Sequence, residues 1–379
     1  MHRFLEYARA AEAGMIETLR ELVECESPSD HAASVNRFVD LIAARVDGMA
    51  QVQTFPGGTF GRHMRCEFNL PGKKKDGQLL ILGHSDTVWP LGTLAHMPFR
   101  QADGRLWGPG VLDMKAGIGF VLSAMRMLRE LDVPVPRRVV LQLNSDEEVG
   151  SDSSRPLTEE AAAKSAAVLV MEPGTGLTGK LKTARKGVGD YTVTVRGRAS
   201  HAGVDFEAGA SAIVELARQV DRIAGFTDLG RGLTVNPGVI SGGTRTNVIA
   251  AEARVDVDIR IARLKDAAGL EKKFRNLKAI DQRCTVAVDG GLNRPPMERS
   301  AGIRKLFKQA RGLAKDLNID LEESSTGGGS DGNFTAALGI PTLDGLGGVG
   351  EGAHALNESI WVDRMADRTA LLALLVSTL

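Results

Sequence analysis

Three short apolar runs constrain the fold of this chain more than any other feature. They lie at 79–82, 138–143 and 167–171, and most of their side chains are apolar. A strand that is covered on both faces has this character, whereas a strand with one exposed face alternates. Helical patterns at about 116–128 and 157–164 separate the runs. This alternation of strand and helix predicts an α/β fold with a mostly parallel central sheet.

Histidines and carboxylates follow these strands. The first run leads to His84 and Asp86, the second to Asp146–Glu148, and the third to Glu172. Because the carboxyl ends of parallel strands meet at one edge of a sheet, we expect these side chains to gather there. Adjacent acids repel one another and need either cations or full solvation. Taken alone, Asp146–Glu148 could therefore be the solvated start of a loop.

Two further residues favour a metal site over that alternative. Asp113 lies in a loop after the first run, and His354 comes from the C-terminal part. Two histidines and three carboxylates are a natural set for two Zn²⁺ ions, which accept nitrogen and oxygen ligands. One carboxylate can bridge such a pair, and in hydrolytic sites the two ions lie about 3.5–4 Å apart.

A different pattern occupies the middle of the chain. At 191–195 and 251–259, apolar side chains alternate with polar ones, which is typical of strands with one exposed face. Together with two amphipathic helices, the order strand, helix, two strands, helix, strand predicts a ferredoxin-like α+β domain. We therefore predict that 184–296 is an inserted domain, while 1–183 and 297–379 together form the α/β domain.

Two local predictions concern the N-terminal part. The spacing of apolar residues predicts one helix at about 4–23 and another at about 31–46. Proline and glycine at 71–77 predict an exposed hairpin turn between strands at 63–70 and 78–83. We interpret the lysine run in this segment as a solvated turn rather than a binding patch.

Charge and composition exclude several other classes. The 47 Lys and Arg balance the 47 Asp and Glu, so the chain lacks the positive footprint of a nucleic-acid or anionic-membrane binder. It has no run of ~18 apolar residues and no apolar signal core, so we expect a cytoplasmic protein without a membrane partner. Ser85 does not lie in a Gly-x-Ser-x-Gly elbow, so it is not a convincing serine nucleophile. The glycine-rich segment 348–352 does not match the fingerprint of a dinucleotide-binding site.

Six motifs stand in the order in which a known family has them. They are Gly83-His84-Ser85-Asp86, Leu112-Asp113-Met114-Lys115, Asp146-Glu147-Glu148-Val149-Gly150, Met171-Glu172-Pro173, Ser200-His201-Ala202-Gly203 and Gly352-Ala353-His354. With them the chain resembles the co-catalytic zinc exopeptidases and amidohydrolases. That family includes glutamate carboxypeptidases, aminoacylases, acetylornithine deacetylases and succinyl-diaminopimelate desuccinylases. The resemblance extends over nearly the whole chain and is closest to the glutamate carboxypeptidase (carboxypeptidase G-like) branch.

The resemblance implies a role for each residue of the α/β domain. Two Zn²⁺ ions per subunit are implied, with Co²⁺ or Mn²⁺ as substitutes, and their ligands are His84 and Glu172 for one ion, Glu148 and His354 for the other, and Asp113 between them. Glu147 would be the general base. Asp86 would accept the second ring N–H of His84. The bond between Asp113 and Met114 is expected to be cis. Asp146 receives no role.

The inserted domain is implied to be a lid and a dimerisation domain. His201 would reach the active site of the partner subunit and stabilise the oxyanion there. Asn247 and Arg260 would hold the terminal carboxylate of the substrate, beside the Gly-rich turn that contains Gly328. From the residues alone, Arg260 could instead form a surface ion pair with Asp258 or Asp256. Lys180 matches a position near the acidic side chain in glutamate-specific members.

Three functions remain open at this point. The first is a zinc carboxypeptidase that releases a C-terminal amino acid, with glutamate as a candidate, from a small peptide or an N-acyl amino acid. The second is an N-deacylase of the acetylornithine deacetylase or aminoacylase type. The third is a non-catalytic metal- or peptide-binding protein, which the complete set of ligands and base disfavours. A homodimer through the lid, and lid closure about hinges near 183–185 and 292–296, are also expected.

Overall fold

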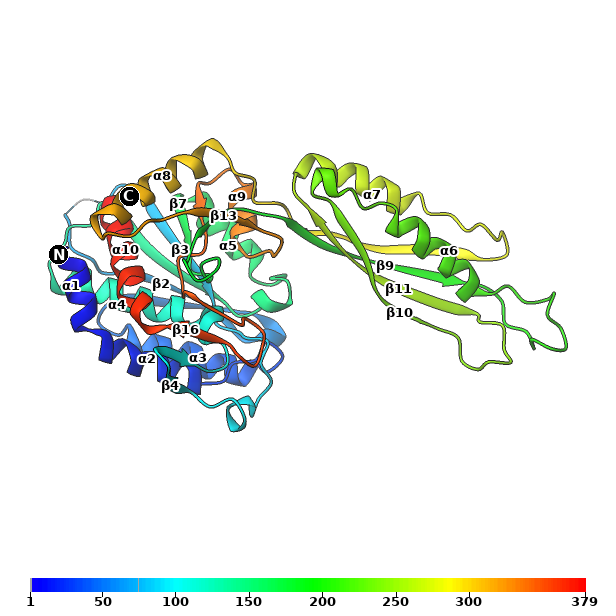
Figure 1. The fold of residues 1–379 in the computed structure, drawn as a ribbon, viewed down its shortest axis with the longest axis horizontal. Helices are drawn as coiled ribbons and strands as arrows, with labels where there is room; N and C mark the ends of the chain where they lie inside the picture. Colours follow the sequence, from blue (N-terminus) through cyan, green and yellow to red (C-terminus); the bar gives the residue numbers. More distant parts are fainter. Residues whose placement is uncertain (1, 74) are drawn as a thin grey trace. The chain divides into compact units, whose positions relative to one another are not determined.

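The computed structural model describes residues 2–73 and 75–379, and these form two compact units (Figure 1). The first unit comprises the chain up to Ala184 together with Arg299–Thr326 and Ser330–Leu379. The second comprises Arg185–Glu298 and the turn Gly327–Gly329. Lys74, part of the predicted lysine turn, lies outside the described residues.

A six-stranded sheet forms the centre of the first unit. In spatial order its strands are β1 (Ala50–Pro56), β2 (Arg62–Phe68), β6 (Arg138–Asn144), β3 (Gln78–His84), β7 (Ser165–Val170) and β14 (Thr342–Leu343). The last four pair in parallel, whereas β1 and β2 add an antiparallel edge. The predicted α/β fold with a mostly parallel central sheet is confirmed.

The continuously apolar sequence of β3 reflects burial on both faces of this sheet. Leu79 and Ile81 belong to the larger core, which includes most of α4 (Ala116–Glu130) and α10 (Met365–Thr378). Leu80 and Leu82 belong to a smaller core on the other face, with Ala161 of α5 (Arg155–Ala163). Because successive side chains of a strand point to opposite faces, a strand between two helical layers must be apolar throughout.

The other helices of this unit complete the two layers (Figure 1). They are α1 (Arg3–Ala10), α2 (Glu12–Glu24), α3 (Ala32–Arg45), α8 (Ala301–Asp316) and α9 (Gly332–Ala337). The single helix predicted at 4–23 is thus two helices, which meet at Ala11. Among the residues that the model describes, none of the helices combines the length and apolarity needed to cross a membrane.

The predicted hairpin at 71–77 is wrong. β2 and β3 do not pair with each other, because β6 lies between them, antiparallel to β2 and parallel to β3. The connection instead runs along the segment that leads into β6, where Val135 N–H donates to Pro71 O at 2.9 Å and Asp76 N–H donates to Pro136 O at 2.9 Å. Glycine and proline predict that the chain turns, but not which strand it joins next.

Two small sheets were not predicted from the sequence. One has the order β15 (Gly350–Glu351), β16 (Ser359–Trp361), β5 (Arg105–Trp107) and β4 (Arg100–Ala102). The other joins β8 (Leu181–Arg185) with β13 (Glu323–Thr326). Their strands have five residues or fewer, which is too short for a periodic pattern to identify.

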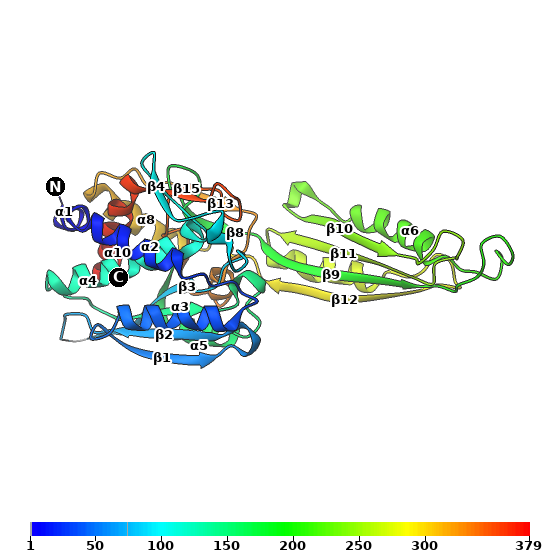
Figure 2. The same ribbon diagram turned by 90° about the horizontal axis from the view of Figure 1, so that it is seen from below.

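The second unit is a four-stranded antiparallel sheet with two helices on one face (Figure 2). Its elements follow the chain as β9 (Gly187–Arg196), α6 (Ala212–Ala224), β10 (Thr234–Gly242), β11 (Glu252–Ile261), α7 (Ala267–Arg275) and β12 (Thr285–Arg294). The spatial order β10-β11-β9-β12 is that of a ferredoxin-like fold, as predicted. Tyr191 stacks on Phe274 in the core of this unit.

Candidate metal centre

The carboxyl edge of the central sheet gathers the predicted ligands of the first unit. His84 is the last residue of β3, Glu148 lies in a 3₁₀ turn (Glu147–Val149) shortly after β6, and Glu172 follows β7. Because β3, β6 and β7 are parallel neighbours, their ends bring these residues to one place. Asp113 and His354 reach the same place from loops.

Two groups of three side chains could each hold a metal ion: His84, Asp113 and Glu172 in one, and Asp113, Glu148 and His354 in the other. The ligand atoms of each group lie within 4.8 Å of one another. His84 Nε2 is 3.3 Å from Asp113 Oδ1 and 3.8 Å from Glu172 Oε1. His354 Nε2 is 3.3 Å from Asp113 Oδ2 and 3.3 Å from Glu148 Oε1. Asp113 therefore offers one oxygen to each group, which is the geometry of a bridging carboxylate.

The electrostatics of this cluster favour added positive charge. Hydrogen bonds from His354 to the Asp113 and Glu148 carboxylates raise the pKa of His354 to about 10. Burial alone lowers the pKa of His84, but the Asp113 and Asp86 carboxylates outweigh it and raise that pKa well above its ordinary value. Glu148 Oε1 is buried, and the described residue that faces it is His354, whose Nε2 lies 3.3 Å away. Imidazole and carboxylate donors with such an oxygen among them fit a pair of borderline cations.

Asp86 holds the turn that carries the two adjacent glutamates. Its Oδ1 accepts the backbone N–H of Glu147 at 3.2 Å, and its Oδ2 accepts that of Glu148 at 3.2 Å and the hydroxyl of Ser29 at 2.7 Å. His84 Nδ1 donates to the backbone carbonyl of Asp86 at 2.9 Å, whereas the nearer carboxylate oxygen is 3.5 Å away. The hydrogen bond that orients the His84 ring is thus made with the main chain of Asp86, the residue predicted to orient it.

Asp146, for which no role was predicted, closes the loop that follows the same turn. Its Oδ2 accepts the N–H of Ser153 at 2.8 Å, the Ser153 hydroxyl at 2.6 Å and the N–H of Ser154 at 3.3 Å. Its carbonyl accepts the N–H of Ser151 at 2.8 Å. The serine-rich sequence at 151–154 was the available signal, since short hydroxyl side chains near an aspartate commonly form such turns.

Two of the predicted ligands have unusual backbone conformations. The peptide bond between Asp113 and Met114 is cis, as predicted. His354 has a φ of 62°. Neither residue lies in a regular helix or strand, because the segment around Asp113 departs from helical angles and His354 lies in a turn.

In the second unit, His201 and Asn247 lie on neighbouring segments. His201 pairs with Val248 in an isolated β-bridge, and Ala202 N–H donates to the Asn247 carbonyl at 2.9 Å. Both residues are exposed. His201 Nδ1 accepts the N–H groups of Gly203 and Val204 at 3.2 and 3.1 Å. In the neutral ring the proton is therefore on Nε2, which makes that atom a hydrogen-bond donor.

The remaining predicted residues, Arg260, Gly328 and Lys180, each contact other residues of their own unit. Arg260 forms a forked ion pair with Asp258, with a closest distance of 2.7 Å, and its Nη1 donates to the Gly327 carbonyl at 3.3 Å. The carbonyl of Gly328, in the same turn, accepts from Arg185 at 3.2 Å. In the first unit, Lys180 Nζ lies 2.8 Å from Glu322. Arg260 thus forms an ion pair with a neighbouring aspartate, the alternative considered from the sequence, and it also contacts the glycine-rich turn.

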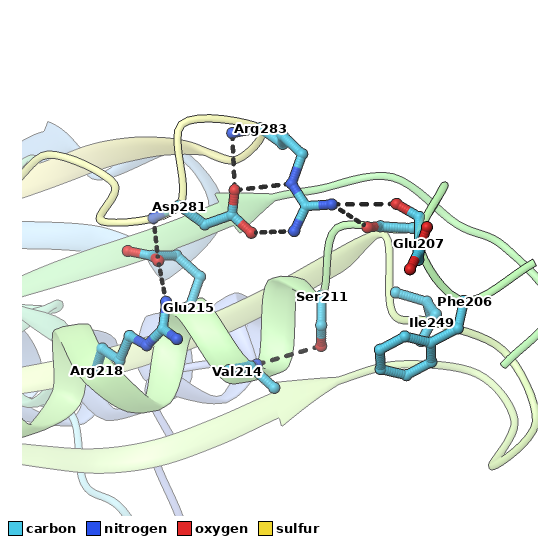
Figure 3. A pocket seen from close by; sticks show the side chains of 10 residues that line it. Phe206, Glu207, Ser211, Val214, Glu215, Arg218, Ile249, Asp281 and Arg283 are labelled. Atoms are coloured by element: carbon cyan, nitrogen blue, oxygen red, sulfur yellow. Dashed lines mark hydrogen bonds and ion pairs between the residues drawn. The ribbon is translucent and has the colours of Figure 1, made fainter.

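A hollow of about 340 Å³ in the second unit contains none of the predicted site residues (Figure 3). Arg283 dominates one wall, where it pairs with Asp281 and donates to the carbonyls of Glu207 and Gly209. On another wall the buried Glu215 accepts the N–H of Asp281 at 3.0 Å. These contacts fasten the loop that follows His201 to the body of the unit.

Comparison with known proteins places the chain in a family. The model of peptidase family M20/M25/M40 matches residues 80–378. Carboxypeptidase G2 of Pseudomonas sp. (strain RS-16) is 31% identical over 349 residues, which cover 90% of this chain and 83% of that protein. A succinyl-diaminopimelate desuccinylase of Cereibacter sphaeroides (strain ATCC 17025 / ATH 2.4.3) is 30% identical over 317 residues, covering 76% of this chain and 80% of that protein.

A solved structure shares the fold. The crystal structure of the aminopeptidase PepT from Bacillus cereus ATCC 10987 has a TM-score of 0.80 and 22% sequence identity, and the match covers 97% of this chain and 98% of that one. These findings confirm the resemblance stated from the six motifs.

Proposed function

This chain belongs to peptidase family M20/M25/M40 and is a metallopeptidase or amidohydrolase of that family, and on that premise we propose that it is a di-zinc carboxypeptidase. It would release a C-terminal amino acid, with glutamate as a candidate, from a small peptide or an N-acyl amino acid. The observation that carries the proposal is the pair of three-residue groups that share Asp113. The name of carboxypeptidase G2, at 31% identity, supports the carboxypeptidase assignment.

Five residues would hold the two ions. His84 and Glu172 would bind one, Glu148 and His354 would bind the other, and Asp113 would contribute an oxygen to each. When bound, two zinc ions lower the pKa of an attacking water and polarise the scissile carbonyl. The cluster fits this role because its carboxylates already raise the pKa of both imidazoles.

Glu147 would move the proton. It stands next to Glu148 in the sequence and belongs to neither group of ligands, and we assign to its carboxylate the task of accepting the proton of the attacking water and passing it to the leaving amine. Asp86 supports this role because it holds the backbone N–H of Glu147 and thereby the position from which the side chain acts.

The substrate would be bound by Arg260, Asn247 and Gly328 of the second unit and by Lys180 of the first. Arg260 would hold the terminal carboxylate as a forked ion pair, which requires it to exchange its bond with Asp258 for one with the substrate. Asn247 and Gly328 would lie beside it, and Lys180 would meet an acidic side chain by opening its pair with Glu322. His201 would donate from Nε2 to the oxygen that becomes negative.

We further propose that the protein is a homodimer in which His201 serves the partner subunit. β10 is an edge strand of the second unit, and its Val239 and Ile240 are each 62% exposed. An edge strand offers unpaired N–H and C=O groups that a second copy can extend. Phe206, in the loop after His201, is 66% exposed as well.

The second candidate is an N-deacylase that removes an acyl group from an amino acid. The 30% identity with a succinyl-diaminopimelate desuccinylase favours it, because the same ligands and base would serve both reactions. The two functions differ in which side of the amide bond the protein recognises.

Metal quantitation combined with a substrate panel tests both candidates. We expect two zinc ions per chain, and chelation should abolish activity that added zinc restores. Turnover of N-acyl-glutamates and dipeptides above that of N-acetylornithine and N-succinyl-diaminopimelate would support the carboxypeptidase. The reverse order would establish the deacylase, and a metal-loaded protein that hydrolyses none of them would refute both.

A further inference from the structure

Glu358 is a fully buried carboxylate whose two oxygens accept four hydrogen bonds. It is 0% exposed. Its Oε2 accepts from the indole of Trp89 at 2.7 Å and from the backbone N–H of Gly110 at 2.8 Å. Its Oε1 accepts the backbone N–H of Leu112 at 2.8 Å and that of Asp113 at 3.0 Å. Three of the four donors are backbone N–H groups of the loop 110–113. One of these three belongs to Asp113, the residue that both metal groups share.

The same glutamate terminates the loop that carries His354. Its own N–H donates to Ala355 O at 2.9 Å, and Ala355 N–H donates to Gly352 O at 2.8 Å, which closes the turn around His354. Glu358 therefore has its backbone in one ligand loop and its carboxylate in the other. The pairing of Trp107 with Ser359 between β5 and β16 joins the same two segments.

Asp113 and His354 depend on hydrogen bonds between their loops more than His84 does. His84 ends a central strand, so the sheet itself fixes its backbone. Asp113 has φ −115° and ψ 94° inside an irregular segment, so neither a helix nor a strand ladder fixes it. Hydrogen bonds to the loop backbone are what remains to fix such a residue, and bonds to an ionised acceptor are the strongest of them.

We propose that Glu358 is a positioning residue of the dinuclear centre, which holds the Asp113 loop against the His354 loop so that both ligands meet the same ions. The proposal rests on the proposed function only in taking Asp113 and His354 as metal ligands. Partners that orient ligands in this way commonly change metal affinity by about 10- to 100-fold when they are removed.

Glu215 offers a matched control in the second unit. Its carboxylate is also buried, with 1% of the residue exposed, and it accepts the N–H group of Asp281 at 3.0 Å (Figure 3). It also accepts the N–H group of Ile280 at 2.9 Å. Glu358→Gln and Glu215→Gln each replace one buried acceptor of backbone N–H groups by an amide. A general effect on stability should therefore appear in both variants, whereas an effect on the metal centre should appear in only one.

The test compares metal affinity, the visible spectrum of the cobalt-loaded protein and the melting temperature of the metal-free protein. For Glu358→Gln we expect zinc affinity, measured by competition with a chelating dye, to fall about 10- to 100-fold and the cobalt bands to shift. For Glu215→Gln we expect a lower melting temperature with wild-type affinity and spectrum. Trp89→Phe, which removes only the indole donor, should give a smaller loss of affinity than Glu358→Gln.

Three outcomes are decisive. Wild-type affinity and cobalt spectrum in folded Glu358→Gln overturn the positioning role. If that variant does not fold, wild-type affinity and spectrum in Trp89→Phe overturn it instead. If the wild-type protein itself binds neither zinc nor cobalt, the proposed function fails, and this result is distinct from both of the others.

Discussion

At the scale of single residues, the three adjacent acids after β6 have three different environments. Asp146 is fully buried, and its Oδ2 accepts from the donors of Ser153 and Ser154. Glu148 faces His354, and the backbone of Glu147 is held by Asp86. Their mutual repulsion is thus offset by main-chain donors and by the positive charge that the metal groups attract. Neighbours in sequence can therefore have separate roles.

Replacement of Glu147 tests the assignment of the general base. Glu147→Gln keeps the size of the side chain and leaves both metal groups intact, so we expect kcat to fall by about 10²- to 10⁴-fold while the protein retains two zinc ions. Steady-state kinetics and elemental analysis of the same sample measure the two effects. A kcat within a factor of two of wild type would remove Glu147 from this role, and loss of metal would move it into the ligand set.

Asp113 and Glu172 differ in how many ions they should support. Asp113 belongs to both groups and Glu172 to one, so we expect Asp113→Ala to lose both ions and Glu172→Ala to lose one. Metal content after dialysis against metal-free buffer distinguishes the two variants. If Asp113→Ala keeps a full complement of zinc, the carboxylate does not bridge.

The gathering of the proposed ligands was predictable from the sequence because each follows a strand or lies in a motif, whereas the residues that hold them in place were not. His84 ends an apolar run, so its place at the sheet edge follows from the fold. Glu358 carries no local signal, since its burial arises only when the segment before β16 folds beneath the loop of Asp113. That His84 Nδ1 lies closer to the carbonyl oxygen of Asp86 (2.9 Å) than to its carboxylate (3.5 Å) likewise depends on geometry that spacing alone does not contain.

At the scale of elements, local periodicity predicted most helices and strands, but not the order of strands in the sheet. β3 and β6 were predicted as buried strands because their central residues, Leu79–Leu82 and Val139–Leu143, are apolar on both faces except for Gln142. Their adjacency, with β2 on the far side of β6, depends on contacts between segments more than fifty residues apart. This non-local pairing is the reason that the hairpin prediction failed.

A buried arginine of helix α10 makes hydrogen bonds to distant loops, and its removal should lower the free energy of unfolding. Arg368 is fully buried in it and donates to the carbonyls of Gly179, Gly345 and Gly347. Arg368→Ala leaves these buried carbonyls without a donor, so we expect the free energy of unfolding to fall by about 2–4 kcal/mol. Urea denaturation of the metal-free protein measures this loss.

An exposed ion pair supplies the comparison for Arg368. Lys164 pairs with Glu160 on α5, and both side chains are about half exposed. Such a pair contributes about 0.3–0.5 kcal/mol, so Lys164→Ala should shift the urea midpoint far less than Arg368→Ala. Equal shifts in the two variants would show that the buried guanidinium is no more important than a surface charge.

At the scale of the whole molecule, the proposed chemistry is divided between the two units. The metal groups and Glu147 belong to the first unit, while His201 belongs to the second. If His201 serves the partner subunit, each complete site needs Glu147 from one chain and His201 from the other. A heterodimer of two variants, one lacking Glu147 and the other lacking His201, would then regain activity at one of its two sites.

Subunit mixing measures this division directly. His201→Ala and Glu147→Gln homodimers should each be nearly inactive, but a heterodimer contains one site with both residues intact. Random exchange makes about half of the dimers heterodimers, each with one working site of two, so we expect about a quarter of wild-type activity. Glu147→Gln mixed with Asp113→Ala is the control, because both changes lie in the first unit and every site in that mixture lacks one of the two residues. Recovery in the first mixture alone requires His201 to act across subunits, whereas no recovery after verified exchange, or a monomer in solution, would place His201 in its own chain's site or outside catalysis.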